Sequence, residues 1–337
     1  MHPLVHEWSR DRLSHEQRYE VWRNTIHLMA GAAHHMENHF RVTSMKPLLT
    51  HVEEGLSQGR YQLFSNGPEL SQRVGAALIF CRLFRYFNRA SSIEFSQGAL
   101  KCIQTKLPGD CNYFPAILEI GAGLQSNGRY KEAISLNLQA TKEAEEAVER
   151  PVSDNQDAVR NQKSAASNTA MLMVNLARAY THDQQNQRSI KICEKLTEVY
   201  TPMLGENSFE VRSTLPILAH AYRDLGDLKR ARKYLEKSIE DERKLFGEDY
   251  QSPEVRQLAE VYIDLKMFKK ARALQSQVVS WAQERYEEDD IDLVLEESIL
   301  QLYQPTGRSV LSGHRKLRER IEGYKKSLKG ILEKGGT

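Results

Sequence analysis

Two groups of histidines have the residue types and spacing to bind a metal ion. They are His2 with His6, and His34, His35 and His39 with Glu37. His35 and His39 lie four residues apart, which places two ligands on one face of a helix. A metal site needs three or four converging ligands, and neither a nearby cysteine nor an H-E-x-x-H motif completes one here. We therefore predict no metal site. A metal-dependent enzyme built on the second group remains an alternative, which elemental analysis of the protein would test.

The residue spacing indicates no other catalytic site. It predicts no Ser/His/Asp or Cys/His catalytic group, and the sequence contains no G-x-x-x-x-G-K-[ST] loop to hold phosphates. The four cysteines, Cys81, Cys102, Cys111 and Cys193, show no C-x-x-C spacing, which suits a reducing compartment. We predict a protein that is not an enzyme, has no cofactor and takes no small-molecule substrate.

Composition points to a helical scaffold. The 337 residues are 40% hydrophobic and 27% charged, with only 19 glycines and 10 prolines, and this argues against an all-β fold. A formal net charge of +2 implies no general attraction to nucleic acid or to a membrane. The N-terminus turns polar at once, and the longest apolar run, Gly75–Cys81, is far shorter than a membrane span. We expect a cytoplasmic protein whose partner is a protein or peptide.

One pattern recurs along the chain: an apolar and a small residue, then a tyrosine or apolar residue, a turn, and a second small residue. We call the tyrosine or apolar position the register position. It falls at Leu124, Tyr180, Tyr222, Tyr262 and Tyr303. The last three intervals are 42, 40 and 41 residues, and the first is 56. The predicted turn positions, four residues later, are Gly128, Gln184, Gly226, Lys266 and Gly307. The small residues nine positions later are Ala133, Ser189, Ala231, Ala271 and Ser312. Each unit thus reads as two antiparallel helices that cross closely at small side chains.

This pattern resembles the tetratricopeptide (TPR) repeat, with its period of 34 residues lengthened by about seven. HEAT and armadillo repeats have periods of 40–47 but do not place small residues and glycine at these offsets. The lengthened form is similar to kinesin-light-chain-type TPRs, in which a Leu-Gly-Glu-like corner follows the second helix. Met203–Glu206 and Leu245–Glu248 match that corner, whereas Tyr286–Glu288 lacks its glycine. The resemblance covers about residues 115–329 and implies an all-α, right-handed solenoid of helical hairpins.

The N-terminal segment MHPLVHEW resembles the end of the winged-helix segment in NB-ARC-type STAND ATPases, the class that includes fungal NLR-like receptors. His2 matches the histidine that approaches ADP in that family, and Pro3 stands where many members have Asp. The chain begins inside this motif and contains no phosphate-binding loop, so we expect no nucleotide binding. The predicted organisation is a helical winged-helix remnant at 1–40, degenerate TPR-like helices at 41–110, and TPR repeats at 111–337.

Two segments interrupt or end the array. The extra residues fall at 150–166, where Pro151 stops a charged helix, and they predict either a solvated loop or an N-terminal extension of the next helix. A regulatory or modified loop is the other alternative. Residues 308–334 are rich in lysine and arginine. Their position in the repeat predicts that they form the second helix (B helix) of the last hairpin, whose polar face caps the array. Binding of this basic segment to an anionic membrane or to calmodulin is a second interpretation.

The predicted binding surface is the concave groove, which the first helices (A helices) of TPR hairpins line. Counting from the register, its exposed positions are Asn175, Arg178, His182, His220, Arg223, Asp224, Glu260 and Asp264. The resemblance to kinesin light chain implies that Asn175 bonds a peptide backbone. We expect Arg178 and Arg223 to share a face and to pair with acidic groups of an extended peptide.

These predictions lead to a non-catalytic scaffold that binds a protein or peptide. It would be a free-standing adaptor or, alternatively, the sensor or regulatory half of a STAND receptor in fungal self/non-self or innate-type signalling.

Overall fold

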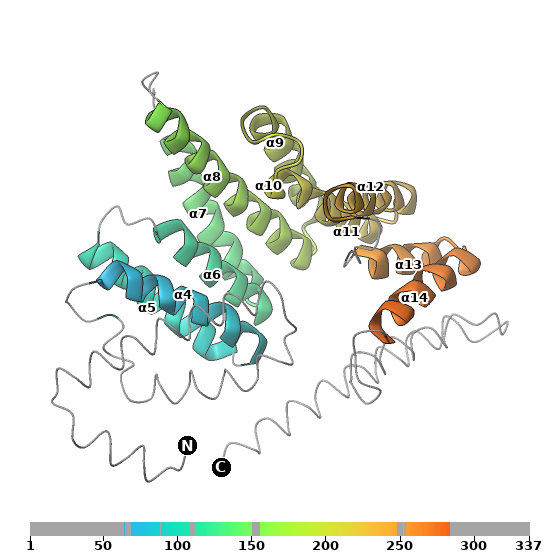
Figure 1. The fold of residues 1–337 in the computed structure, drawn as a ribbon, viewed down its shortest axis with the longest axis horizontal. Helices are drawn as coiled ribbons and strands as arrows, with labels where there is room; N and C mark the ends of the chain where they lie inside the picture. The colour runs from blue at the N-terminus through green and yellow to red at the C-terminus, as the bar shows by residue number, and fades with distance from the viewer. Residues whose placement is uncertain are drawn as a thin grey trace, which may run out of the picture. The chain divides into compact units, whose positions relative to one another are not determined.

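A computed structural model describes residues 64, 69–87, 89–107, 112–149, 156–247, 252 and 254–283. These residues form α-helices and their connections, with no β-strand among them (Figure 1). The helices are α4 (Leu70–Phe87), α5 (Arg89–Lys106), α6 (Tyr113–Ser126), α7 (Tyr130–Val148), α8 (Gln156–His182), α9 (Asn186–Leu204), α10 (Phe209–Arg212), α11 (Thr214–Asp224), α12 (Leu228–Phe246), α13 (Glu254–Asp264) and α14 (Phe268–Gln283). None of the described helices is both long and apolar enough to cross a membrane.

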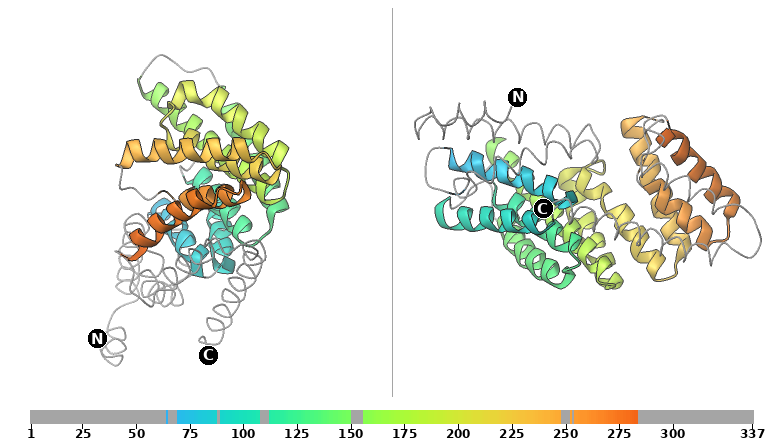
Figure 2. Two further views of the ribbon diagram at one scale, coloured as in Figure 1. Left: turned by 90° about the vertical axis from the view of Figure 1, so that its right-hand side faces the viewer. Right: turned by 90° about the horizontal axis from the view of Figure 1, so that it is seen from below.

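The chain divides into two compact units. Unit 1 ends at Gly205 and contains α4 to α9; unit 2 begins at Glu206 and contains α10 to α14. Within each unit consecutive helices pack as hairpins, namely α4 with α5, α6 with α7, α8 with α9, α11 with α12, and α13 with α14 (Figure 2). We call the first helix of each hairpin A and the second B.

The predicted turn position has the same backbone conformation in every hairpin where the register was counted and the structure is described. Its φ is +74° at Gly128, +60° at Gln184, +81° at Gly226 and +60° at Lys266. The residue after it donates its N–H to the carbonyl of the register residue, as Asp227 does to Tyr222 at 2.8 Å. The turn residue itself donates to the carbonyl three residues earlier, as Gly226 does to Arg223 at 2.9 Å. This pair of bonds is the Schellman motif, which satisfies the carbonyls at the end of each A helix.

The small residue five positions after the turn is fully buried in all four hairpins. Ala133, Ser189, Ala231 and Ala271 each have no exposed surface. The register residue is buried beside it, and Tyr222 stacks on Tyr234 of the B helix with ring centroids 5.6 Å apart. A larger side chain at the small position would separate the two helices, so the residue sets how closely they cross.

Glycine is also required at the two predicted corners. Gly205 ends α9 with φ +92° and ψ +152°, and Gly247 ends α12 with φ +101° and ψ +160°. This region of backbone space is essentially restricted to glycine. The Leu-Gly-Glu-like corners therefore occur at these two sites because the chain leaves each B helix in a conformation that other residues avoid.

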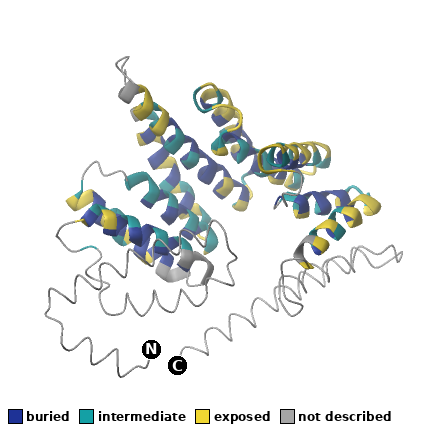
Figure 3. Cartoon of the chain, viewed as in Figure 1, coloured by how far each residue is buried: buried dark blue, intermediate teal, exposed yellow. Residues whose placement is uncertain are grey.

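Continuous apolar contacts hold unit 1 together, and its buried faces lie between the helices (Figure 3). Gly121 of α6 shows how closely two helices approach. A Cβ atom at Gly121 would lie 2.8 Å from Nδ2 of Asn137 in α7, whose fully buried amide donates to the Ala133 carbonyl at 2.7 Å. The A–B crossing at this point leaves no room for a methyl group.

Among the extra residues predicted at 150–166, the structure describes 156–166 and decides between two alternatives for them. Helix α8 begins at Gln156, so residues 156–166 extend the next A helix instead of forming a loop, and Ala166 is fully buried. The predictions for residues 1–40, for His2, His34, His35 and His39, and for the last B helix at 308–334 lie outside the described residues.

Exchanging turn residues should change stability in opposite directions. A left-handed conformation costs a non-glycine residue about 1–2 kcal/mol, so Lys266→Gly should stabilise the protein by about 0.5–1 kcal/mol after the entropy cost of glycine. Gly226→Ala should destabilise it by about 1–2 kcal/mol. Urea unfolding midpoints measure both changes. The control is Lys237→Gly, at an exposed position in the interior of α12, which should cost about 1 kcal/mol. Equal losses for Lys266→Gly and Lys237→Gly would contradict the turn assignment.

Gly121→Ala should destabilise unit 1 by about 1–3 kcal/mol because the new methyl group meets Asn137. In an Asn137→Ala background the same substitution should cost little, since the opposing amide is gone. Gly75→Ala serves as the matched control. Among the described residues its Cβ would meet only Asn112 Oδ1, at 3.6 Å, and the change should stabilise the protein by up to about 1 kcal/mol. The free energies come from urea unfolding, and a full penalty in the Asn137→Ala background would show that crowding is not the cause.

Candidate peptide-binding surface

The A helices of unit 1 lie against one another. Helix α6 packs on both α4 and α8, whereas no B helix among the described residues packs to a similar extent on another B helix. Helices on the inner side of a curved array approach one another more closely than those on its outer side. Within unit 1, therefore, α4, α6 and α8 form the inner side, as predicted for A helices of a solenoid.

Polar side chains link these A helices. Arg82 Nε of α4 lies 2.8 Å from Glu119 Oε1 of α6, and the Glu119 side chain is largely buried. Between α6 and α8, Gln125 Nε2 donates to the backbone carbonyl of Asn175 at 3.2 Å. Asn175 Nδ2 in turn lies 3.5 Å from the Leu118 carbonyl.

Asn175 is therefore not an exposed groove residue. Only 6% of its surface is exposed, and the expectation that its side chain faces solvent is wrong. Its amide faces the preceding A helix, which sequence spacing within α8 could not show. Arg178 and His182, by contrast, are exposed, and His182 stacks on Tyr130 with ring centroids 5.5 Å apart.

In unit 2 the structure brings all five predicted residues into two interacting groups. Arg223 of α11 forms ion pairs with two carboxylates of α13, Glu260 and, at 2.7 Å, Asp264. His220 Nδ1 lies 3.5 Å from Asp224 Oδ2 on α11. We call this surface, made of His220, Arg223, Asp224, Glu260 and Asp264, the acidic A-helix face.

The charge of this face is negative. Burial of the Arg223 guanidinium lowers its pKa, but Glu260 and Asp264 together outweigh that effect and raise the pKa above its ordinary value. Arg223 is thus positive. The face carries this one positive charge and the three carboxylates of Asp224, Glu260 and Asp264, which leaves two net negative charges when His220 is neutral. Including Arg256, which is exposed on α13, still leaves the face negative.

This geometry differs from the expectation that Arg223 would pair with acidic groups of a peptide, because its own chain already supplies two carboxylates. The predicted common face of Arg178 and Arg223 stays a prediction, since the two residues belong to different units. The partner-binding role of the eight residues is likewise a prediction.

Sequence reasoning missed Arg82, Glu119 and Gln125, although the register held a signal for two of them. Glu119 lies five residues before Leu124, as Asn175 lies five before Tyr180, and both contact the preceding A helix. Gln125 and Arg223 each follow a register residue directly, and both reach the next A helix. Arg82 lies outside the counted register.

The described residues contain no group of three or more side chains suited to hold a metal ion. The thiol of Cys193 is equally unsuited to nucleophilic chemistry. Burial raises its pKa to about 12, so the thiol is protonated at neutral pH.

Comparison with known proteins gives one family match. Residues 168–250 match the tetratricopeptide repeat family. No curated protein matches the sequence. Among solved structures, the kinesin light chain TPR-like repeats of Podosopora anserina are 18% identical, with a TM-score of 0.45, covering 64% of this chain and 99% of that chain. BtubC (BKLC) from P. vanneervenii is 16% identical, with a TM-score of 0.45, covering 75% and 91%. The apo form of RapI is 13% identical, with a TM-score of 0.48, covering 87% and 99%.

Because these identities and TM-scores are low, the fold is assigned from the family match and from the helices of the chain. The hairpins, their shared turn and the match over residues 168–250 make the fold an all-α tetratricopeptide repeat solenoid.

Proposed function

We propose that this protein is a non-catalytic scaffold that binds a protein or peptide along its A helices. We further propose that the acidic A-helix face of unit 2 selects segments rich in lysine or arginine. The observation that carries this proposal is an excess of carboxylates on this surface. Glu260 and Asp264 both pair with Arg223, and Asp224, which lies beside His220, adds a third carboxylate.

The same carboxylates are accessible enough to meet a ligand. The side chains of Asp224 and Asp264 are 38% and 36% exposed, and that of Glu260 is 29% exposed. A lysine or arginine placed between α11 and α13 would compete with Arg223 for Glu260 and Asp264 and would balance the excess charge. Complementary charge of this kind raises association rates and selects among partners.

Selection of a random phage-displayed peptide library on the full chain tests this proposal. The selected peptides should be enriched in lysine and arginine, and their affinity should fall as salt rises. The variant Asp224→Asn/Glu260→Gln/Asp264→Asn keeps a carbonyl oxygen for Arg223 but removes three charges. It should bind the selected peptides about tenfold more weakly or worse.

The control carries the same change in net charge on B helices of unit 1. Glu146, Glu194 and Glu198 are exposed on α7 and α9, and their replacement by glutamine should leave affinity unchanged. Acidic or uncharged selected peptides, or equal affinities for the two triple variants, would refute a basic ligand on this face.

A second candidate function is the sensor half of a STAND receptor. The segment MHPLVHEW, with His2 at the position of the family histidine, favours it. In such a receptor these repeats would detect the ligand while a separate module hydrolysed ATP. Sequencing the transcript upstream of Met1 tests this candidate: an in-frame phosphate-binding module would support it, and an in-frame stop codon would argue against it.

A further inference from the structure

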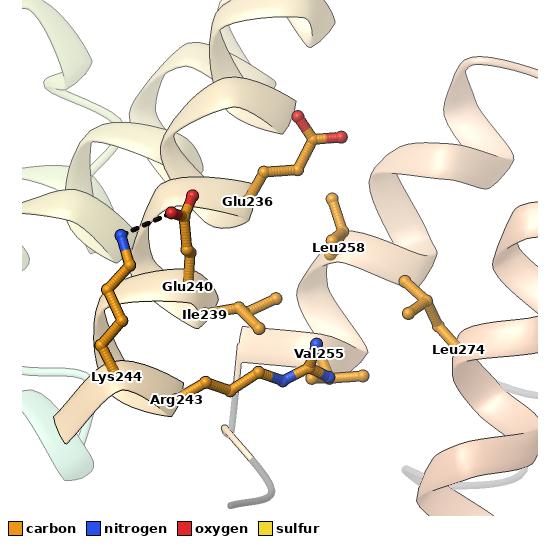
Figure 4. A pocket seen from close by; sticks show the side chains of 8 residues that line it. All are labelled: Glu236, Ile239, Glu240, Arg243, Lys244, Val255, Leu258 and Leu274. Atoms are coloured by element: carbon orange, nitrogen blue, oxygen red, sulfur yellow. Dashed lines mark hydrogen bonds and ion pairs between the residues drawn. The ribbon is translucent and has the colours of Figure 1, made fainter. Parts of the chain in front are cut away.

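A pocket of about 370 Å³ lies in unit 2, between α12, α13 and α14 (Figure 4). Its floor is apolar and consists of Ile239, Val255, Leu258 and Leu274. Ile239, Val255 and Leu258 are each no more than 5% exposed. The volume is at the lower end of the range for ligand sites, which suits one or two side chains rather than a large cofactor.

Charged residues of α12 line the rim, and Glu236, Glu240 and Lys244 each have a hydrogen-bond partner. Lys244 Nζ donates to Glu240 Oε1 at 2.5 Å, and this bond lowers the pKa of Glu240. Glu236 accepts a hydrogen bond from the Tyr262 hydroxyl at 2.9 Å. Burial and this bond raise the pKa of Tyr262 to about 12, so the phenol remains a donor at neutral pH.

Arg243 is the exception on this rim. Its Nε atom is buried and has no hydrogen-bond partner among the described residues. Figure 4 shows its side chain extending from α12 toward Val255, at the edge of the apolar floor. A buried guanidinium N–H without an acceptor is costly, and a carboxylate is the acceptor that its geometry fits best.

We propose that this pocket binds an aliphatic side chain of a partner protein together with an adjacent carboxylate, as in a Leu-Glu or Leu-Asp pair. The aliphatic group fills the apolar floor, and the carboxylate accepts hydrogen bonds from Arg243. This site requires acidic residues in its ligand, whereas the acidic A-helix face requires basic ones, so neither proposal depends on the other.

Ligand-observed NMR with the full chain tests the proposal. The probes are the capped tetrapeptides acetyl-Gly-Leu-Glu-Gly-amide, the same peptide with Gln for Glu, and the same peptide with Ala for Leu. The Leu-Glu peptide should bind, and each replacement should weaken binding about tenfold, because it removes either the charge or the apolar group.

Two substitutions locate the binding site. Arg243→Met keeps an apolar stem but removes the charge, and should weaken binding of the Leu-Glu peptide about tenfold. Leu274→Glu places a carboxylate at the pocket and should abolish binding by occupying Arg243 from within. Arg272→Met, at an exposed position of α14 outside the pocket, is the control and should bind as the wild type does.

Far-UV circular dichroism establishes that each variant is folded. If Arg243→Met does not fold, Leu274→Glu still tests the proposal. The Asp224→Asn/Glu260→Gln/Asp264→Asn variant should bind the Leu-Glu peptide normally, which separates this site from the acidic A-helix face. Equal binding of the Glu and Gln peptides, unchanged binding by Arg243→Met and Leu274→Glu, or no binding to the wild type would overturn the proposal.

Discussion

The structure depends on one backbone constraint, a single left-handed residue at the end of each A helix. It lets the following N–H bond the carbonyl of the register residue, and so fixes where the B helix begins. The small residue then arrives five positions later at the point where the two helices cross. Glycine satisfies this constraint at Gly128 and Gly226, and the chain tolerates Gln184 and Lys266 in the same conformation. The conformation is therefore set by the hairpin and not by glycine alone.

The same register determines how neighbouring hairpins meet. The residue after the register position reaches forward to the next A helix, as Gln125 and Arg223 do. The residue five positions before it faces the preceding A helix, as Glu119 and Asn175 do. Polar contacts between A helices are thus a consequence of hairpin geometry. The chemistry of these contacts varies from one pair of helices to the next. An arginine–glutamate ion pair links α4 to α6, amide and backbone groups link α6 to α8, and an arginine between two carboxylates links α11 to α13.

Sequence could predict the features that depend on local spacing. The turn positions, the buried small residues and the corners at Gly205 and Gly247 could all be predicted, because each follows from backbone geometry within one hairpin. It could not predict that Asn175 is buried, because that depends on how close α6 lies. Nor could it choose between a loop and a helix for residues 156–166, since that polar, alanine-containing segment is compatible with both. The pocket beside Arg243 could not be predicted from the sequence either, because its walls come from three helices.

Carboxyl footprinting tests most directly whether ligands bind the acidic A-helix face. Carbodiimide and glycine ethyl ester label accessible carboxylates, and mass spectrometry measures the extent at each residue. When a selected basic peptide is bound, labelling of Asp224, Glu260 and Asp264 should fall, while that of Glu194 and Glu198 on α9 should not change. Unchanged labelling of the first three residues, with the peptide demonstrably bound, would contradict binding at this face.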